Sequence, residues 1–291
     1  MRPAFDLFRR VITAWTFAHG FSDSQIPDDQ ALDEAWAVRR PWIEHLWRTS
    51  AENWVAVDAD DRIIGWAMSV QRDTLLELVF FFVDTEVQAK GVGQALLTRA
   101  FPLGRGPHRA IVATQDPRAL SRYLRAGVRF VTTVVDFVAA PRAVDVETDL
   151  RFRRLTSSDA SIALVADLEQ AVIGHRRELD TGLMLSQRPA WAAFRGDEPV
   201  GFAFGHRDEL CGPMGALDPK DVPALLAHVE SEAAREGASK LYVSTPLAND
   251  EAVRHLLGRG FKLDPFVAAI LADDLSMRLD RWIHTGLSYI L

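Results

Sequence analysis

The chain has 291 residues, of which 48% are apolar and 25% are charged, a composition able to bury the cores of two ordinary globular domains. Its net charge of -7 argues against a protein that binds nucleic acid through phosphate contacts. No apolar run reaches the roughly 20 residues that span a bilayer, so we expect no membrane partner. Cys211 is the only cysteine, which excludes an intrachain disulfide and favours a reducing, cytoplasmic setting.

The first half of the chain opens with two helical patterns and continues with a set of strands. The turn sequence Asp-Ala-Asp-Asp-Arg predicts a hairpin between the first two strands. Helices and strands then alternate, so we expect a mixed, mostly antiparallel sheet flanked by helices. The expected helices are 5–20, 29–49, 88–101 and 117–126, and the expected strands are 53–58, 62–71, 74–83, 109–114 and 129–138.

The second half repeats this order of elements and part of the sequence. The segment 241–261 matches 110–130, with Gly260 in the place of Gly127. Two copies are too few for a solenoid, so the repeat indicates two similar domains in tandem. The expected strands of the second copy are 190–195, 199–206, 211–217, 240–245 and 261–272, and its helices are 219–236 and 249–258.

The boundary between the two copies is expected in the segment 139–149. This segment is charged, poor in apolar residues and contains Pro141, and a new alternating pattern begins at Leu150. The predicted domains are therefore 1–142 and 150–291.

A glycine-containing motif follows the strand at 74–83. It reads Gln-Ala-Lys-Gly-Val-Gly-Gln from Gln88 to Gln94 and opens a helix. A helix N-terminus presents unpartnered N–H groups and a partial positive charge, and glycines let a phosphate approach the backbone. The motif therefore predicts an anion site, most naturally for a diphosphate. A tight turn without a ligand is the alternative.

The stretch from Val83 to Leu97 resembles the acyl-CoA-binding motif of the Gcn5-related N-acetyltransferase (GNAT) superfamily, Gln/Arg-x-x-Gly-x-Gly/Ala after the fourth strand. The order of elements in both halves is also similar to that fold. The resemblance implies two tandem GNAT-like domains of α/β (α+β) class, with coenzyme A (CoA) held by backbone N–H groups of the motif and by the end of the preceding strand. The implied cofactor-binding residues are Phe82, Val83, Gln88, Ala89, Lys90, Gly91, Val92, Gly93 and Gln94.

Tyr123 lies in a segment similar to the family pattern Asn-x-x-Ala-x-x-x-Tyr-x-x-x-Gly-Phe, whose tyrosine commonly protonates the CoA sulfur. Ala119, Tyr123 and Gly127 keep this spacing, whereas Asp116 replaces the asparagine and Val128 the phenylalanine. The resemblance implies that Tyr123 is a catalytic acid. The alternative is a helix residue that packs at the edge of the core.

Glu77 lies 11 residues before Gln88, the spacing at which the histone-acetylating branch of the superfamily carries its base. A carboxylate flanked by Leu and Phe is desolvated, which favours its accepting a proton. The resemblance therefore implies a catalytic role for Glu77. One alternative is an outward-facing carboxylate paired with an arginine on a half-exposed strand, and another is a base formed by a water chain and a different residue.

The second copy departs from the motif at each of these places. Asp218 and Pro219 suit the N-cap and first position of a helix, where the carboxylate would occupy the N–H groups and repel a phosphate. Leu256 stands where Tyr123 lies in the first copy, and it has no proton to donate. We therefore expect a degenerate second domain that is structural or forms a wall of the acceptor pocket.

The resemblance implies an acetyl-CoA-dependent N-acetyltransferase that acts directly on an amine of a small molecule or peptide. Alternatives are a CoA-binding sensor or scaffold without catalysis, a longer acyl group, and a hydroxyl acceptor. The eight histidines form no HxxxH or HxH pair, so we expect no metal, and we expect His175 to be exposed in a polar loop. The sequence leaves the oligomeric state open, a homodimer included.

Overall fold

The computed structural model describes residues 1–21, 28–87, 91–207, 209–273 and 277–286. The chain forms two compact units, one of Met1–Ile111 with Pro117–Arg129 and one of Val112–Asp116 with Phe130–Leu291. The sequence-based domain limits, 1–142 and 150–291, remain a prediction. No helix in the described ranges has the length and apolar content needed to cross a membrane.

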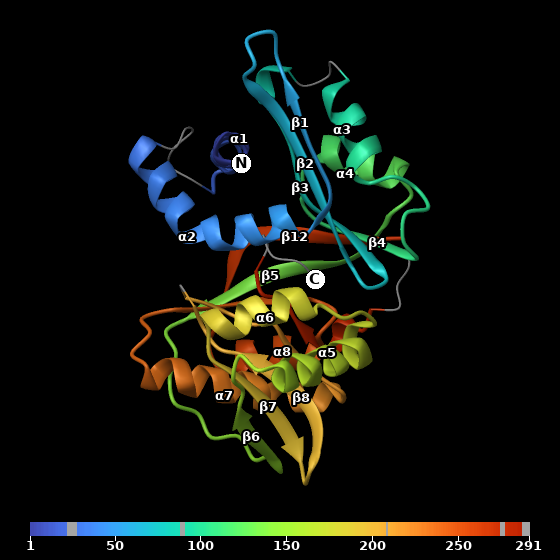
Figure 1. Cartoon of the computed structure of the whole chain (residues 1–291). Helices are drawn as coiled ribbons and strands as arrows, with labels where there is room; N and C mark the ends of the chain where they lie inside the picture. Colours follow the sequence, from blue (N-terminus) through green and yellow to red (C-terminus); the bar gives the residue numbers. More distant parts are fainter. Residues whose placement is uncertain (22–27, 88–90, 208, 274–276, 287–291) are drawn as a thin grey trace. The chain divides into compact units, whose positions relative to one another are not determined.

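The first unit is a mixed sheet with helices on both faces, in the order β1-β2-β3-β4 (Figure 1). Neighbouring strands are antiparallel except for β3 and β4, which are parallel. This confirms the predicted fold class. The elements are α1 (Arg2–Ala18), α2 (Asp29–Arg48), β1 (Ser50–Val57), β2 (Ile63–Arg72), β3 (Leu75–Val83), a 3-10 turn (Thr85–Val87), α3 (Val92–Ala100), β4 (His108–Thr114, shared with the second unit) and α4 (Pro117–Arg125).

Helices α1 and α3 cover opposite faces of this sheet. A Cβ atom at Gly65 of β2 would lie 2.7 Å from Cδ1 of Leu96, so a larger residue here would force the Leu96 side chain or α3 to shift. The next residue, Trp66, stacks on Phe80 with ring centroids 4.3 Å apart, and Phe80 contacts Phe8 of α1. Successive strand residues point to opposite faces, which fixes one face as the α1 face and the other as the α3 face.

The second unit contains two groups of strands, in the orders β12-β5-β11-β9 and β13-β10-β8-β7-β6. Its strands are β5 (Arg129–Ala139, whose first residue belongs to the first unit), β6 (Leu150–Arg154), β7 (Ala190–Arg195), β8 (Glu198–Phe204), β9 (Leu210–Cys211), β10 (Met214–Ala216), β11 (Leu241–Pro246), β12 (Lys262–Ala272) and β13 (Trp282–Ile283). Its helices are α5 (Asp159–Ile173), α6 (Glu178–Gln187), α7 (Val222–Arg235) and α8 (Asp250–Gly258), with 3-10 turns at Pro219–Asp221 and Leu279–Arg281.

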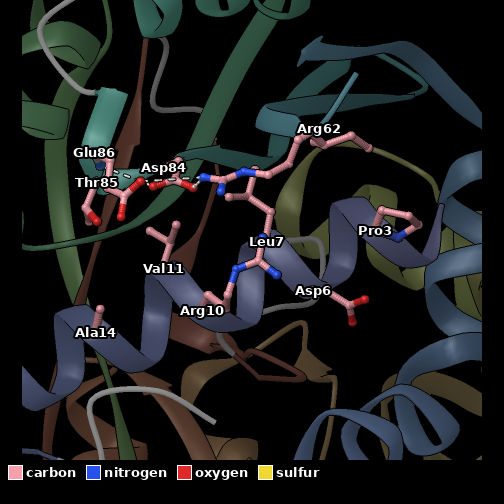
Figure 2. Close-up of a pocket in the computed structure, with 11 residues that line it drawn as sticks. Pro3, Asp6, Leu7, Arg10, Val11, Ala14, Arg62, Asp84, Thr85 and Glu86 are labelled. Atoms are coloured by element: carbon pink, nitrogen blue, oxygen red, sulfur yellow. Dashed lines mark hydrogen bonds and ion pairs between the residues drawn. The ribbon is translucent and has the colours of Figure 1, made fainter. Parts of the chain in front are cut away.

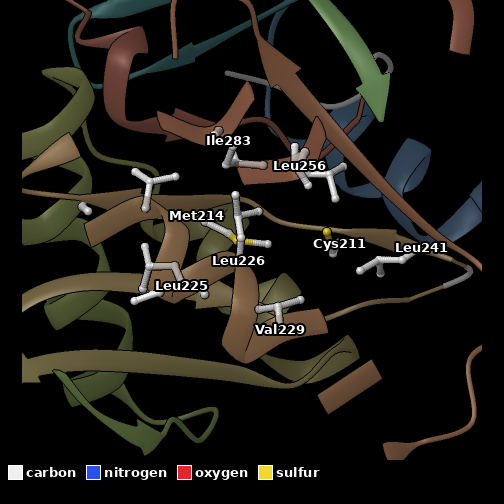
Figure 3. Close-up of a cluster of buried hydrophobic side chains, with 14 of the residues drawn as sticks. Cys211, Met214, Leu225, Leu226, Val229, Leu241, Leu256 and Ile283 are labelled. Atoms are coloured by element: carbon white, nitrogen blue, oxygen red, sulfur yellow. The ribbon is translucent and has the colours of Figure 1, made fainter. Parts of the chain in front are cut away.

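The core of the second unit gathers apolar side chains of α7, α8 and several strands (Figure 3). Cys211 lies in this cluster and is fully buried, and burial raises the pKa of its thiol to about 12. The thiol is therefore a packed group that stays protonated at neutral pH. Leu256 packs in the same cluster, where a polar side chain at the position equivalent to Tyr123 would lack water.

Both glycines of the repeat terminate a helix in the same way. Gly127 follows α4 with φ +91°, and Gly260 follows α8 with φ +83°, a left-handed conformation that favours glycine. The sequence match between 110–130 and 241–261 thus reflects a strand, helix and glycine turn of equal form in the two units.

Candidate functional site

Helix α3 begins at a glycine without a capping side chain. Gly91 occupies the N-cap with φ +86°, and no side chain of the described chain caps the helix. By contrast, Asp28 caps α2 by accepting a 2.7 Å hydrogen bond from the Ala31 N–H. The first turn, Gly91–Gln94, is called the α3 turn below. Gln88, Ala89 and Lys90 of the predicted site lie outside the described residues.

The two glycines of the α3 turn have different surroundings. Nothing lies within 4 Å of a Cβ atom placed at Gly91, and a Cβ at Gly93 would make ordinary contacts, 3.5 Å from Cζ of Phe81 and 3.6 Å from Cζ of Arg122. The glycine at 91 is required by its backbone conformation, whereas packing within the protein would admit an alanine at 93. Gly91 is exposed, whereas Gly93 is buried against Phe81 and Arg122, so it is at Gly91 that the turn suits a ligand approaching the backbone.

Replacing Gly91 with alanine should lower the free energy of unfolding by about 1 kcal/mol, because a left-handed backbone is strained for a residue with a Cβ. Gly258 is the matched control, since it is helical and has open space around it. There, alanine should stabilise the protein by about 0.4–1 kcal/mol. Urea unfolding of both variants measures the difference, and equal shifts would contradict the left-handed conformation at Gly91.

Tyr123 of α4 and the α3 turn both lie next to Phe81 of β3. Its side chain is buried, with 5% exposed, and its ring meets that of Phe81 edge-on with centroids 5.8 Å apart. The same Phe81 ring faces the Cβ position of Gly93. The structure therefore gathers the predicted acid and the predicted diphosphate site on one face of the sheet.

The far end of β3 extends past the part of the strand that pairs with β4. The parallel register runs from Leu75, opposite His108, to Leu78, opposite Ile111, whereas β3 continues to Val83. The predicted cofactor residues Phe82 and Val83 lie in this extension and are half-buried. The Phe82 ring points to the α1 face, with its centroid 4.7 Å from that of Phe8, so any contact with a ligand on the α3 face would be through its backbone.

Glu77 lies on the opposite face from Tyr123. Glu77 stands across from Val70 of β2, and Val70 lies on the α1 face together with Trp66. Phe81, which contacts Tyr123, stands across from Ala67, which lies on the α3 face. A shift of register at Val79, between Leu78 and Phe80, makes this change of side possible. The structure thus places the two predicted catalytic groups on different sides of β3.

The Glu77 carboxylate is buried, with 3% exposed. The alternative of an outward-facing carboxylate on a half-exposed strand is therefore wrong, because β3 is covered on both faces at this point. Arg72 is also buried. It stands opposite Leu75, which lies two residues before Glu77, so Arg72 and Glu77 share one face of the sheet. Arg72 donates a 2.8 Å hydrogen bond to Oγ1 of Thr49, at the end of α2.

Comparison with known proteins decides the family of the first unit. The profile of the acetyltransferase (GNAT) family matches residues 17–128, a range that holds the α3 turn, Glu77 and Tyr123. Residues 17–128 belong to the GNAT family. This assignment supports acetyl transfer from an acyl-CoA in general. No curated protein matches the chain.

Solved structures extend the GNAT likeness over nearly the whole chain. A putative acetyltransferase from Pyrococcus horikoshii has a TM-score of 0.65 at 13% identity, covering 95% of this chain and 89% of its own. A GCN5-related N-acetyltransferase from Sphaerobacter thermophilus has a TM-score of 0.63 at 16% identity, covering 95% and 96%. A tandem GNAT protein from the clavulanic acid biosynthesis pathway has a TM-score of 0.53 at 12% identity, covering 92% and 94%. At these identities the likeness establishes the fold.

The helix that follows β10 differs from the GNAT turn of the first unit, as the sequence predicts. Asp218 accepts a 3.0 Å hydrogen bond from the Lys220 N–H, and Asp221 forms a 2.8 Å ion pair with Arg195. Two carboxylates therefore stand at the start of α7, and Pro223 has no N–H to offer. The Asp218 carboxylate therefore occupies a backbone donor that a diphosphate would need, and the prolines remove others.

A cavity of about 540 Å³ lies beside α1 in the GNAT unit (Figure 2). One stripe of α1, which includes Leu7 and Arg10, lines one side, and residues next to β2 and β3 line the other. Figure 2 shows Arg62 reaching Asp84 at 3.0 Å across this second side. Helix α1 thus forms one wall of the cavity, and Glu77 is not among the described residues that line it.

Two other predictions concern histidines and metals. His175 is buried, with 2% exposed, so the expectation of surface exposure is wrong. It lies between α5 and α6, two helices that sequence analysis did not predict and that pack against each other. Among the residues that the structure describes, no group of three or more His, Cys, Asp or Glu side chains is arranged to hold a metal ion.

Proposed function

We propose that the first unit transfers an acetyl group from acetyl-CoA directly to an amine. The observation that carries this proposal is the gathering of Tyr123, Phe81 and the α3 turn on one face of the sheet, inside the segment that matches the GNAT family. Acetyl-CoA supplies the activated acyl group, and the chain supplies binding, orientation and proton transfer.

The chain fits the cosubstrate at its diphosphate end. Backbone N–H groups of Gly91 to Gln94 point out of a helix start without a side-chain cap, and the helix dipole favours an anion there. The stretch of β3 at Phe82 and Val83, past the end of the β4 pairing, suits a ligand that lies along the strand. Tyr123 then holds its hydroxyl proton for the sulfur that leaves.

The opposite placement of Glu77 and Tyr123 suits direct transfer. The attacking amine and the leaving sulfur stand on different sides of the reacting carbonyl carbon, so the group that takes a proton and the group that gives one should also stand apart. Glu77 on the α1 face accepts the amine proton, directly or through water, and Tyr123 on the α3 face protonates the sulfur. The acceptor therefore approaches from the side covered by α1 and α2.

One experiment tests binding and catalysis together. Purified protein is titrated with CoA by calorimetry, and thiol release from acetyl-CoA is followed over a panel of amines. Heat on titration and thiol release with at least one amine are expected. Heat without thiol release would favour a CoA-binding sensor, and no heat would overturn the proposal.

Replacing Gln94 with glutamate should weaken CoA binding about tenfold, because it puts a negative charge beside the diphosphate without changing the side-chain shape. Gln94 is exposed at the third position of α3, where an acid also stabilises the helix by about 0.3–1 kcal/mol. Thr98→Glu, one turn further on, is the matched control and should weaken binding less. Equal losses in the two variants would contradict a diphosphate at the α3 turn.

A further inference from the structure

Arg122 lies beside the α3 turn, although sequence analysis did not select it. Its Cζ and Nη1 atoms are both 3.6 Å from the position of a Cβ atom on Gly93. The residue directly precedes Tyr123 on α4, so one helix presents a guanidinium to the α3 turn and a phenol to Phe81. The side chain is half-buried, which limits how far it is screened by water.

The charge of Arg122 has no acidic partner among the described residues. No carboxylate there lies within 4 Å of its guanidinium, whereas arginines such as Arg62 and Arg105 form ion pairs. Helix α4 carries three arginines and no acid, in a chain of net charge -7. A half-buried arginine without a counter-charge, next to bare backbone N–H groups, suits a phosphate, which a guanidinium binds in bidentate fashion.

We propose that Arg122 binds the diphosphate of CoA from α4, beside the backbone donors of the α3 turn. This inference rests on the proposed function and adds a side chain to a site that the sequence motif assigns to backbone groups. The missing Cβ of Gly93 then has a second consequence: it lets the guanidinium lie close against the α3 turn. The backbone N–H groups and the guanidinium beside them then contact the diphosphate together.

The test is calorimetric titration of wild type, Arg122→Ala, Arg122→Gln and Arg125→Ala with CoA, dephospho-CoA and pantetheine. Arg125 is the matched control, because it is an exposed arginine on the same helix. Loss of a charge-assisted phosphate contact should weaken CoA binding at least about tenfold in both Arg122 variants and less than about twofold in Arg125→Ala. Thermal melting of each variant shows whether it is folded, and Arg122→Gln keeps most of the side-chain length.

The three ligands separate the possible outcomes. An equal loss with CoA and dephospho-CoA, and no loss with pantetheine, supports a contact to the diphosphate. A loss with CoA alone would overturn that assignment in favour of the 3′-phosphate, and unchanged CoA affinity in a folded Arg122 variant would overturn the inference altogether. Wild-type protein that binds no CoA would instead refute the proposed function, so the two failures are distinguishable.

Discussion

Replacing Tyr123 with phenylalanine should lower kcat for acetyl transfer by about 100-fold or more and leave the Kd for CoA within about twofold of wild type. General acid catalysis by one positioned group contributes roughly 10²–10⁴ in rate, and this substitution removes only the hydroxyl. The edge-on contact with Phe81 needs the ring and not the oxygen, so packing between α4 and β3 should persist.

Three measurements separate an acid from a packing residue at position 123. Turnover is followed by thiol release, affinity by calorimetry and folding by thermal melting. Tyr123→Leu is the informative companion, since it imitates Leu256 at the equivalent position of the second unit and removes the ring as well. If Tyr123 only packs, the phenylalanine variant keeps wild-type turnover and the leucine variant loses stability.

Most helices and strands can be predicted from the sequence because they depend on residues that are close together in the chain. The hairpin of β1 and β2 and the helices α4 and α8 follow from turn residues and from apolar periodicity, and the structure has them within a few residues of the expected ranges. The strand expected at 211–217 is broken into β9 and β10 at Gly212 and Pro213, where the proline has no N–H for a ladder.

Properties that depend on packing between distant segments escape the sequence. His175 lies in a polar stretch that looks like an exposed loop, but burial depends on what α5 and α6 cover. The separation of Glu77 and Tyr123 onto two faces, which sequence analysis did not predict, also requires the register shift at Val79, which no residue pattern marks. Arg122 has a local signal, a helix with three arginines and no acid, yet only its approach to Gly93 relates it to the site.

Replacing Glu77 with glutamine should lower kcat by about 100-fold, with CoA affinity nearly unchanged. When the acceptor is an amine too weakly basic to be protonated over the pH range, the substitution should also abolish the fall in rate at low pH. A base must be ionised to accept the amine proton, so the wild-type rate falls as pH drops and the carboxylate is protonated. Glutamine has the same shape but accepts no proton, which removes this part of the pH–rate profile.

The burial of Glu77 makes the pH profile the deciding measurement. A buried carboxylate beside Arg72 on the same face also contributes to folding, so a loss of stability alone would not identify a base. Glu86→Gln is the control, because that acid is well exposed just past β3 and should affect neither turnover nor profile. With such a weakly basic acceptor, a folded Glu77→Gln variant that keeps the low-pH fall in rate would show that another group, or a water chain, takes the proton. In that case the roles proposed for the α3 turn and for Tyr123 would stand, because neither diphosphate binding nor protonation of the sulfur depends on Glu77.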